Sequence, residues 1–392
     1  MAEWIMKKLK DIADFNPRES LAKGTVAKKV AMDKLQPFCR DVLGYRLETF
    51  SGGVKFRNGD TIMARITPCL ENGKTAKISI LDDGEVGFGS TEYIVFRAKE
   101  GMDENFIYYL VCSPLVREPA LKSMVGSSGR QRVQTDVVQN LEIMVPDYDE
   151  QKKISGLLKS LDDKIAANTE LNKNLESQAQ AYFIDLFVVN TDPDWPKGTL
   201  SDLGTVIGGG TPSKKHPEYY SEHGIPWITP KDLSVDKSKF VSHNENDISE
   251  LGFSNSSATK MPEGTVLFSS RAPIGYIAVA SNTVTTNQGF KSVIPNNNVG
   301  TAFMYFFLKQ ALSTIEGMAS GSTFKEISGS GMKSVPAVIP DNETLCIFSE
   351  FCKPIFKQQA VMEAENRRLS GIRDALLPKL MSGELDVSNL DL

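Results

Sequence analysis

Three short stretches carry side chains whose types and spacing could do chemistry. The Gly-rich run at 208–210 could cradle a phosphate, but no Gly-Lys-Ser or Gly-Lys-Thr follows it and no dinucleotide-binding spacing appears, so a turn is expected. Asp147, Glu150 and Lys152 stand in the order of a metal-nuclease motif. Their carboxylates lie three residues apart at a predicted helix start, where acidic groups cap the helix and favour its dipole. Residues 192–195 (DPDW) are similar to an amino-methyltransferase loop, but Asp replaces its second Pro and no Gly-rich cofactor-binding turn precedes them. They are predicted to be linker.

Histidine and cysteine give no further sign of a reactive centre. The three histidines, His216, His223 and His243, lack the spacing of metal ligands and stand in no triad order with a Ser or Cys. The five cysteines are scattered and odd in number, which predicts reduced, buried thiols. The chain is therefore expected to hold no catalytic residue, no metal and no cofactor of its own.

Composition is that of an ordinary globular protein. The 392 residues suffice for two or three domains, and 41% are apolar and 24% charged. No signal peptide is apparent and no run approaches the roughly 18 apolar residues of a membrane span, so a cytoplasmic protein without membrane association is predicted. The net charge of −5 disfavours nucleic acid at first sight. Most of the excess acid falls in two predicted helical segments, however, and balanced globular segments can still bind DNA.

A long helix is predicted for the central segment, 150–187. Its apolar seam advances in alternating steps of four and three residues, the pattern of a helix that packs along another helix. At 1.5 Å per residue it would be roughly 55 Å long. Asn residues on such a seam cost stability but fix register. The seam comprises Ile154, Leu158, Leu161, Ile165, Asn168, Asn172, Leu175, Ala179, Tyr182 and Leu186.

An internal repeat supplies the partner helix. A shift of 194 residues superimposes the second half on the first, with looser matches at an offset of 205 upstream. The second seam comprises Phe348, Cys352, Ile355, Gln359, Met362, Asn366, Leu369, Arg373, Leu376 and Leu380. We expect the two helices to pack antiparallel as a coiled coil; the alternative is two unrelated surface helices. Pro354 should kink or break the second helix, leaving it regular from 356 to 377, and Pro378 should end it.

The remaining segments predict mainly β structure with a few short helices. Strands are expected at 61–66, 76–81, 93–98 and 141–145, and again at 265–269, 276–280 and 291–294. The fold class is therefore α+β, with two mainly-β domains and a long antiparallel two-helix coiled coil between them. The expected division is 1–149, a first globular domain; 150–189, a central spacer helix; 190–340, a second globular domain; and 341–392, a C-terminal spacer helix.

Motif order gives a resemblance to a known family. The loop Gly126–Val133, the strand Leu141–Pro146 and the helix start Glu150–Ile154 follow one another, and Ser320–Ile327 and Val335–Pro340 repeat the loop and strand. This order resembles the target-recognition domains and conserved-region helices of type I restriction–modification specificity subunits, and covers the whole chain. Thr344–Leu345 departs from the pattern, because Glu150–Gln151 stands there in the first copy.

The resemblance implies a non-catalytic subunit that reads DNA for other subunits. Each domain would read half of a bipartite, asymmetric site in double-stranded DNA, and the helix pair would set the spacer and dock two methyltransferase subunits. S-adenosylmethionine, ATP and Mg²⁺ would bind to those subunits and to a motor-nuclease subunit. The complex would methylate adenine N6 and cleave DNA with ATP. Two alternatives remain: a stand-alone DNA-modifying enzyme, and a coiled-coil scaffold with no DNA role.

Candidate DNA contacts lie in flexible Gly/Ser loops and strand ends that carry Arg, Lys, Asn or Gln, because such groups reach phosphates and base edges. In the first half they are Arg65, Ser127, Ser128, Arg130, Gln131 and Arg132. In the second half they are Lys214, Lys215, Lys231, Arg271, Asn287, Gln288, Ser322, Thr323 and Lys325.

Overall fold

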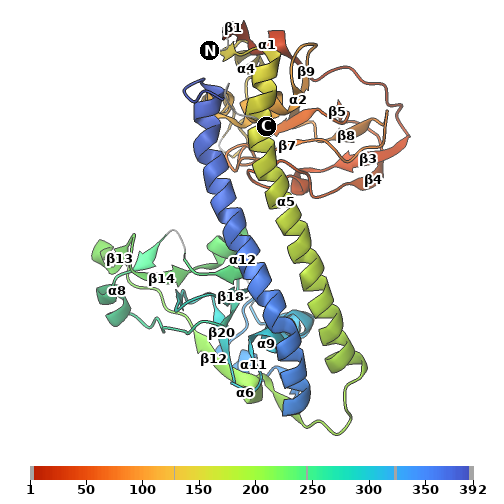
Figure 1. The fold of residues 1–392 in the computed structure, drawn as a ribbon. Helices are drawn as coiled ribbons and strands as arrows, with labels where there is room; N and C mark the ends of the chain where they lie inside the picture. Colours follow the sequence, from red (N-terminus) through yellow and green to blue (C-terminus); the bar gives the residue numbers. More distant parts are fainter. Residues whose placement is uncertain (1–3, 128, 244–245, 322–324, 388–392) are drawn as a thin grey trace. The chain divides into compact units, whose positions relative to one another are not determined.

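The computed structural model describes residues 4–127, 129–243, 246–321 and 325–387 (Figure 1). Its residues form two compact units. Unit 1 comprises Met1–Ala167 and Asn366–Leu392, and unit 2 comprises Asn168–Glu365. Each unit therefore holds one half of each long helix together with one globular part.

The globular part of unit 1 is built on two four-stranded sheets and a two-stranded ribbon. The first sheet has the order β2 (Ala13–Phe15), β9 (Tyr93–Ala98), β6 (Thr61–Ala64), β7 (Thr75–Lys77). The second has the order β4 (Arg46–Thr49), β3 (Val26–Val30), β8 (Gly87–Gly89), β5 (Lys55–Phe56). The ribbon pairs β1 (Ile5–Lys8) with β10 (Glu142–Val145). The short helices are α1 (Leu9–Ile12), the 3₁₀ turn η1 (Met32–Lys34), α2 (Glu104–Cys112), α3 (Pro114–Lys122) and α4 (Thr135–Gln139).

Helix α2 forms the centre of the unit 1 core. Its residues from Phe106 to Val111 are all buried, so the helix has apolar contacts on every side. The Asp103 side chain caps its first turn by accepting a hydrogen bond from the Phe106 amide at 2.8 Å. Ile154 and Leu158 of the first long helix join the same core.

Unit 2 repeats this plan. Its main sheet has the order β12 (Gly204–Gly208), β20 (Lys291–Pro295), β17 (Val266–Ser270), β18 (Ile274–Ala280), β15 (Phe240–Val241). A second sheet has the order β13 (Tyr220–Ser221), β16 (Asp247–Ile248), β14 (Ile225–Ile228), β19 (Thr285–Thr286), and a ribbon pairs β11 (Lys197–Thr199) with β21 (Pro336–Val338). The short helices are α6 (Leu200–Leu203), the 3₁₀ turn η3 (Pro217–Tyr219), α7 (Pro230–Val235), α8 (Glu250–Ser254), α9 (Thr301–Gln310), α10 (Leu312–Met318) and α11 (Gly329–Lys333).

Particular elements correspond between the units. The parallel pair β3–β8 in unit 1 has its counterpart in the parallel pair β14–β19 in unit 2. The cis peptide bonds Thr67–Pro68 and Ala272–Pro273 follow β6 and β17, at the offset of 205 residues found in the sequence. The sequence and the structure thus place the same framework twice in one chain.

The two long helices are α5 (Tyr148–Ile184), extended by a π-helical turn η2 (Asp185–Val189), and α12 (Asn342–Met381). The prediction that Pro354 would break the second helix is wrong, and so is the regular range 356–377, because α12 is helical through both Pro354 and Pro378. A proline removes one hydrogen bond from the helix. On either side of Pro354, Cys352 and Ile355 are buried in the unit 2 core, and this packing keeps the helix intact.

Within each unit the halves of α5 and α12 run antiparallel. In unit 1, Arg373 donates a hydrogen bond to Asp162 at 2.7 Å, and Asn366 donates one to the Ile165 carbonyl at 3.5 Å. As the residue number rises on α5, it falls on α12, which defines the direction.

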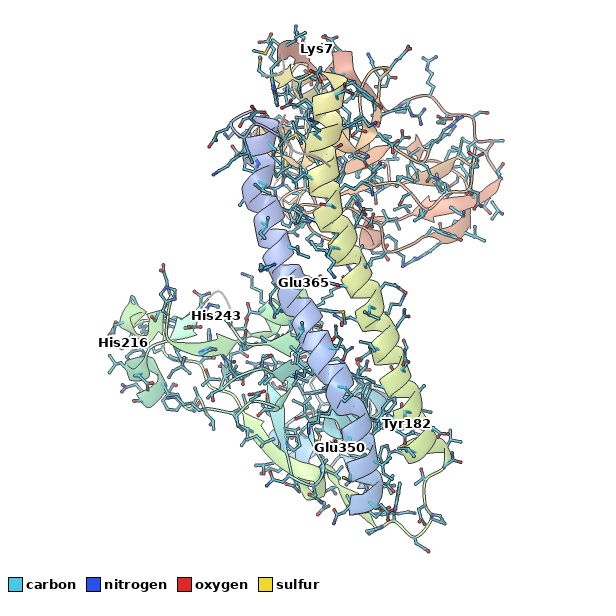
Figure 2. The ribbon with its side chains drawn as sticks, in the orientation of Figure 1. Lys7, Tyr182, His216, His243, Glu350 and Glu365 are labelled. Atoms are coloured by element: carbon cyan, nitrogen blue, oxygen red, sulfur yellow. The ribbon has the colours of Figure 1, made fainter. Side chains whose placement is uncertain are left out.

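The same direction holds in unit 2. Asn168 donates to Glu365 at 2.8 Å, and Gln359 donates to the Asn172 carbonyl at 3.0 Å. The Tyr182 ring packs 4.6 Å from that of Phe351, one residue from Glu350 in Figure 2.

The predicted seam residues face inward. Ile154, Leu158, Asn168, Met362 and Leu369 are buried. Of the other seam residues, a second group is also buried: Ala179, Phe348, Cys352, Ile355, Gln359, Arg373 and Leu380. The rest are half-buried: Leu161, Ile165, Asn172, Leu175, Tyr182, Leu186, Asn366 and Leu376.

The prediction that the cysteines are buried is corrected in part. All five are free thiols, but only Cys352 is buried and Cys346 is exposed, so the predicted burial is wrong for Cys346. Cys346 lies in the first turns of α12, on a part of the helix surface that the core does not cover.

Candidate nucleic-acid interface

The Gly/Ser loop of unit 1 is a hairpin closed by Val125 and Arg132. Their backbones exchange two hydrogen bonds, of 3.0 and 2.9 Å. Gly126 has φ +135°, and a Cβ there would lie 2.9 Å from the Arg130 carbonyl oxygen, so this position requires glycine. We call the residues between Val125 and Arg132 loop 1.

Loop 1 is attached to the segment that follows strand β6. Thr67 donates its amide to the Gln131 carbonyl at 3.1 Å, and the Gln131 amide donates to the Thr67 hydroxyl at 3.0 Å. The Val133 amide donates to the Arg65 carbonyl at 2.9 Å. The backbone of Gln131 and Val133 therefore holds the base of the loop to the segment that follows β6.

Unit 2 attaches its own loop in the same way. Ser320 and Glu326 exchange backbone hydrogen bonds of 3.1 and 2.9 Å, and the Ile327 amide donates to the Ser270 carbonyl at 3.1 Å. Glu326 also forms a bridge with Arg271, after β17. We call the residues between Ser320 and Glu326 loop 2. Among the DNA candidates, Ser128, Ser322 and Thr323 lie outside the described residues.

The candidates in unit 1 fall into two groups. Ser127 and Arg130 are exposed, and the Arg130 guanidinium has no hydrogen bond or ion pair with another described residue. Arg65, Gln131 and Arg132 lie together at the loop base, where the half-buried Arg65 donates to the Val133 carbonyl at 3.2 Å.

Arg132 is engaged by a carboxylate that the sequence analysis did not connect with it. Its Nε lies 2.9 Å from Oε2 of Glu92 and its Nη2 lies 2.7 Å from Oε1. This hydrogen bonding holds the pKa of Glu92 below its usual value. The charge of Arg132 is therefore largely balanced inside the unit.

In unit 2 the Gly-rich run packs against the Asn287–Gln288 segment. The Gly210 amide donates to the Thr286 carbonyl at 2.9 Å, and Thr211 donates its hydroxyl to Gln288. A side chain on Gly209 would overlap the Asn287 carbonyl oxygen, which explains the glycine. Gly208 ends strand β12, and Gly209 and Gly210 continue as a packed segment without regular secondary structure, where a turn had been expected.

The cationic candidates of unit 2 are dispersed. Lys214 and Lys215 are exposed after this turn, and Lys325 is exposed in loop 2. Lys231 lies exposed in the first turn of α7. Arg271 lies 3.4 Å from Glu326. The structure thus brings Asn287 and Gln288 toward the Gly-rich turn and Arg271 toward loop 2.

Two further cations, which nothing in the sequence singles out, join the globular parts to α5. The Arg40 carbonyl accepts the Lys77 amide of β7 at 2.9 Å, and the Lys239 carbonyl accepts the Val279 amide of β18 at 2.7 Å, so the two residues are equivalent. Arg40 donates to Asp163 of α5 at 2.7 Å.

Lys239 is the more deeply buried of the two. It is 7% exposed and donates to Glu176 of α5 and, at 2.8 Å, to Gln359 of α12. Its ammonium lies 4.3 Å from the ring centre of Phe356 and 4.6 Å from that of Tyr305. Burial lowers the pKa of Lys239. Burial also acts to raise the pKa of Glu176, but Lys239 and Lys309 together outweigh it and the pKa is lowered. No local sequence signal distinguishes Lys239, which follows Asp236, Lys237 and Ser238 in an otherwise polar stretch.

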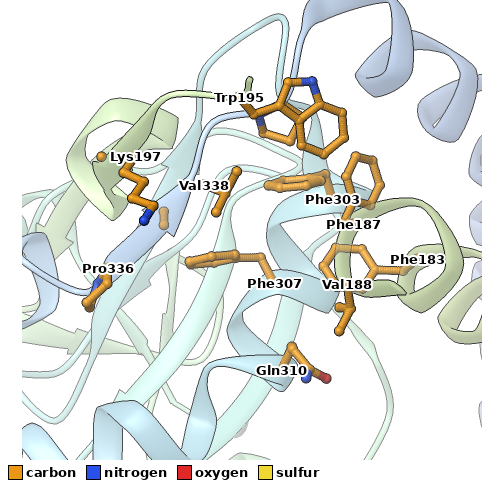
Figure 3. Close-up of a pocket in the computed structure, with 13 residues that line it drawn as sticks. Phe183, Phe187, Val188, Trp195, Lys197, Phe303, Phe307, Gln310, Pro336 and Val338 are labelled. Carbon is orange, nitrogen blue, oxygen red and sulfur yellow. The ribbon is translucent and has the colours of Figure 1, made fainter. Parts of the chain in front are cut away.

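A pocket of about 320 Å³ in unit 2 lies among aromatic side chains of α5, η2 and α9 (Figure 3). Phe183, Phe187, Phe303 and Phe307 line it, and Lys197 is the only ionisable residue among its lining residues. One lysine without an acid or base beside it offers no proton-transfer pair.

Two of the histidines lie beside carboxylates. His216 and His243 are labelled in Figure 2. His216 lies 3.0 Å from the Glu218 carboxylate, and His243 lies 3.3 Å from that of Asp247. Among the described residues there is no cluster of three or more His, Cys, Asp or Glu side chains that could hold a metal ion. Nor is any described helix both long and apolar enough to cross a membrane.

Comparison with known proteins identifies the family. Residues 1–177 and 193–367 each match the type I restriction modification DNA specificity domain. The chain therefore belongs to this family, as the motif order had indicated.

Individual proteins of this family are similar to the chain in sequence. The chain is 38% identical over 179 residues to the MjaIX specificity subunit of Methanocaldococcus jannaschii, a match that covers 43% of this chain and 41% of that one. It thus spans about two-fifths of that relative. It is 26% identical over 406 aligned residues to the HindI specificity subunit of Haemophilus influenzae, covering 84% and 87%.

A solved structure has the same fold. The S subunit of a type I restriction–modification system from M. genitalium matches with a TM-score of 0.60 at 16% identity, over 99% of this chain and 97% of that one. The mixed helix-and-sheet fold class is thereby confirmed.

Proposed function

We propose that this chain is the DNA sequence-specificity subunit of a type I restriction–modification complex, and that each globular part reads one half of a bipartite site. The observation that carries the proposal is the double match to the DNA specificity domain. Loops 1 and 2 are attached by hydrogen bonds to equivalent backbone positions in the two units. This arrangement suits a framework that is kept while its reading side chains vary.

The target is asymmetric because the two readers differ. Loop 1 exposes Ser127 and Arg130, whereas the described part of loop 2 exposes Lys325, with Lys214 and Lys215 on another loop of unit 2. Arg can bind guanine through two hydrogen bonds, while Lys serves mainly as a point charge for phosphates or base acceptors. Different side chains on one framework select different half-sites.

The two long helices act as a spacer and a docking surface. They run antiparallel within each unit as a coiled coil, with the domain division 1–149, 150–189, 190–340 and 341–392. A helix of 37 residues measures roughly 55 Å, between one and two turns of duplex of about 34 Å each.

Their outer faces carry apolar side chains that suit partner subunits. Leu171, Ile347, Phe351, Val361 and Ile372 are each at least 40% exposed. We propose that two methyltransferase subunits dock on the helices and that a motor-nuclease subunit joins them. S-adenosylmethionine, ATP and Mg²⁺ bind to those partners, which perform adenine-N6 methylation and cleavage, while this chain is non-catalytic.

Selection of duplexes from a randomised library by the full chain with its methyltransferase subunits tests the proposal. The selected sequences should show two defined blocks separated by a gap of fixed length. Arg130→Ala should weaken preference in one block only, and Lys325→Ala in the other. A single continuous block, or no sequence preference, would contradict the proposal.

A further inference from the structure

We propose that Arg132 and Glu92 form an anchor pair that positions loop 1, and that Arg130 is the cation of the loop that contacts DNA. The inference rests on the proposed function, and it assigns different roles to the two arginines at loop 1: Arg132 positions the loop and Arg130 binds DNA. In unit 2 the corresponding anchor is Glu326 with Arg271 and Lys291.

The contacts of Arg132 leave little of its charge for DNA. Its Nε and Nη2 hold both oxygens of the Glu92 carboxylate, at 2.7 to 3.0 Å. The Arg65 amide in turn donates to the Glu92 carbonyl at 2.9 Å, so Glu92 is fixed by the strand region beneath the loop. A guanidinium paired in this two-pronged way is positioned by geometry as well as charge, and the pair is neutral as a whole.

Arg130 has the opposite character. It lies two residues before Arg132, and both arginines are exposed, but the Arg130 guanidinium has no hydrogen bond or ion pair with another described residue. Its backbone is ordered by the bond from its amide to the Ser127 carbonyl at 3.0 Å. Between the two arginines, Gln131 turns its backbone inward to Thr67. The loop therefore presents Arg130 outward and keeps Arg132 at its base.

The second unit gives independent support through reversed charge. Glu326 occupies the position of Arg132, at the repeat offset of 194, and makes the equivalent loop-closing bonds. It lies 3.4 Å from Arg271 and 3.7 Å from Lys291. An anion at this position would be repelled by phosphates, so phosphate contact cannot be the role that the two positions share. An ion pair that ties the loop to the sheet is common to both.

Titration of binding against salt separates the two roles. The full chain with its methyltransferase subunits is bound to a duplex that the wild type selects from a random library. Each phosphate contact contributes about 0.9 to the slope of log K against log salt. Arg130→Ala should lower the slope by about 1. Arg132→Ala should weaken binding roughly fivefold, the size of one well-formed surface ion pair, and leave the slope unchanged.

Substitution of Glu92 distinguishes the anchor role most clearly from a direct electrostatic effect on DNA. Removal of an acidic group near bound DNA ordinarily strengthens binding, because it relieves repulsion from phosphates. The anchor instead predicts that Glu92→Ala weakens binding as Arg132→Ala does, and only for the half-site read by unit 1. The double exchange Glu92→Arg with Arg132→Glu reproduces the polarity of unit 2 and should recover most of the affinity lost by Arg132→Glu alone. Arg46→Ala breaks an exposed ion pair with Asp33 elsewhere in unit 1 and is the control for general loss of such a pair.

Three results would overturn the anchor while the proposed function stands: equal slope changes for Arg130→Ala and Arg132→Ala, stronger binding by Glu92→Ala, or no recovery in the double exchange. A wild-type complex that selects no sequence would overturn the proposed function, and the anchor with it.

Discussion

The ammonium group of Lys239 donates a hydrogen bond to the carboxylate of Glu176, and the two side chains are largely buried within unit 2. Lys239 precedes strand β15 and Glu176 lies on α5, so the contact joins the globular part to the helix. Lys309 of α9 donates to the same carboxylate at 2.7 Å. Desolvation of such a pair offsets much of its attraction, but the loss of one partner leaves the other charge buried and unpaired.

Glu176→Ala should therefore lower the free energy of unfolding by about 3 kcal/mol. Urea denaturation followed by circular dichroism measures it. The matched control replaces Glu176 and Lys239 by apolar residues, Glu176→Leu with Lys239→Met, and should be much less destabilising, because the deeply buried ammonium is gone and the remaining cation, Lys309, is 32% exposed and can be solvated. A loss below about 1 kcal/mol for Glu176→Ala would show that water reaches Lys239.

Phe348 is the aromatic centre of the unit 2 core. It is fully buried, and its ring lies 5.3 Å from that of Phe187 and 5.7 Å from that of Phe183. Phe348→Ala should cost about 3 to 5 kcal/mol of unfolding free energy, through lost burial and the cavity left behind. Phe351→Ala, on the same helix at 41% exposure, should cost clearly less. Equal losses for both variants in urea denaturation would argue against this placement of α12.

Pro354 lies exposed inside α12 and removes one hydrogen bond from a helix that continues past it. Pro354→Ala should restore that bond and raise the free energy of unfolding by about 1 to 3 kcal/mol. The control is Pro114→Ala, because Pro114 stands in the first turn of α3, where no bond is lost. Thermal melting compares the two variants, and a lower melting temperature for Pro354→Ala would contradict the expectation.

Asp341 caps the start of α12. Its carboxylate accepts the Thr344 amide at 2.8 Å and the Trp195 indole N–H at 2.9 Å. The Thr344 backbone bond comes first among the causes that lower the pKa of Asp341. Because the folded-state pKa is depressed, the stabilisation is present above the unfolded value of about 3.9 and is lost as pH falls through the folded-state pKa.

Asp341→Asn keeps a side chain that can cap the helix but should lose the pH-dependent stabilisation from the carboxylate. The unfolding free energy of this variant should therefore fall less than that of the wild type between pH 4 and 2, roughly the range of carboxyl titration. Asp341→Ala should cost about 1 kcal/mol at pH 7. Unfolding free energies measured at several pH values check both, and parallel pH curves for wild type and Asp341→Asn would refute the role of the carboxylate.

Secondary structure was predicted best where burial of one helix face requires apolar residues at regular spacing. Ile154 and Leu158 stand out because a helix that packs along another must repeat apolar residues every three or four positions, and both are fully buried. The strand Tyr93–Ala98 was predicted with its observed limits, because turn residues mark both ends.

Contacts between distant residues could not be predicted in this way. Glu92 and Arg132 stand 40 residues apart, and nothing local in either segment shows that the fold brings them together. The predicted helix break at Pro354 was wrong for a related reason. The local effect of proline on the helix is outweighed by the core packing of its neighbours. The DNA contacts proposed for Arg130 and Lys325 remain predictions.

We propose above that two different readers in one chain direct methylation to a split DNA sequence. The most direct test of this claim maps methylated adenines in the host genome with and without this chain, while its methyltransferase partners are present. We predict modified adenines in one asymmetric motif of two blocks with a fixed gap, all of which disappear when the chain is removed. A methylation pattern that persists without the chain, or that follows a continuous motif, would contradict the claim.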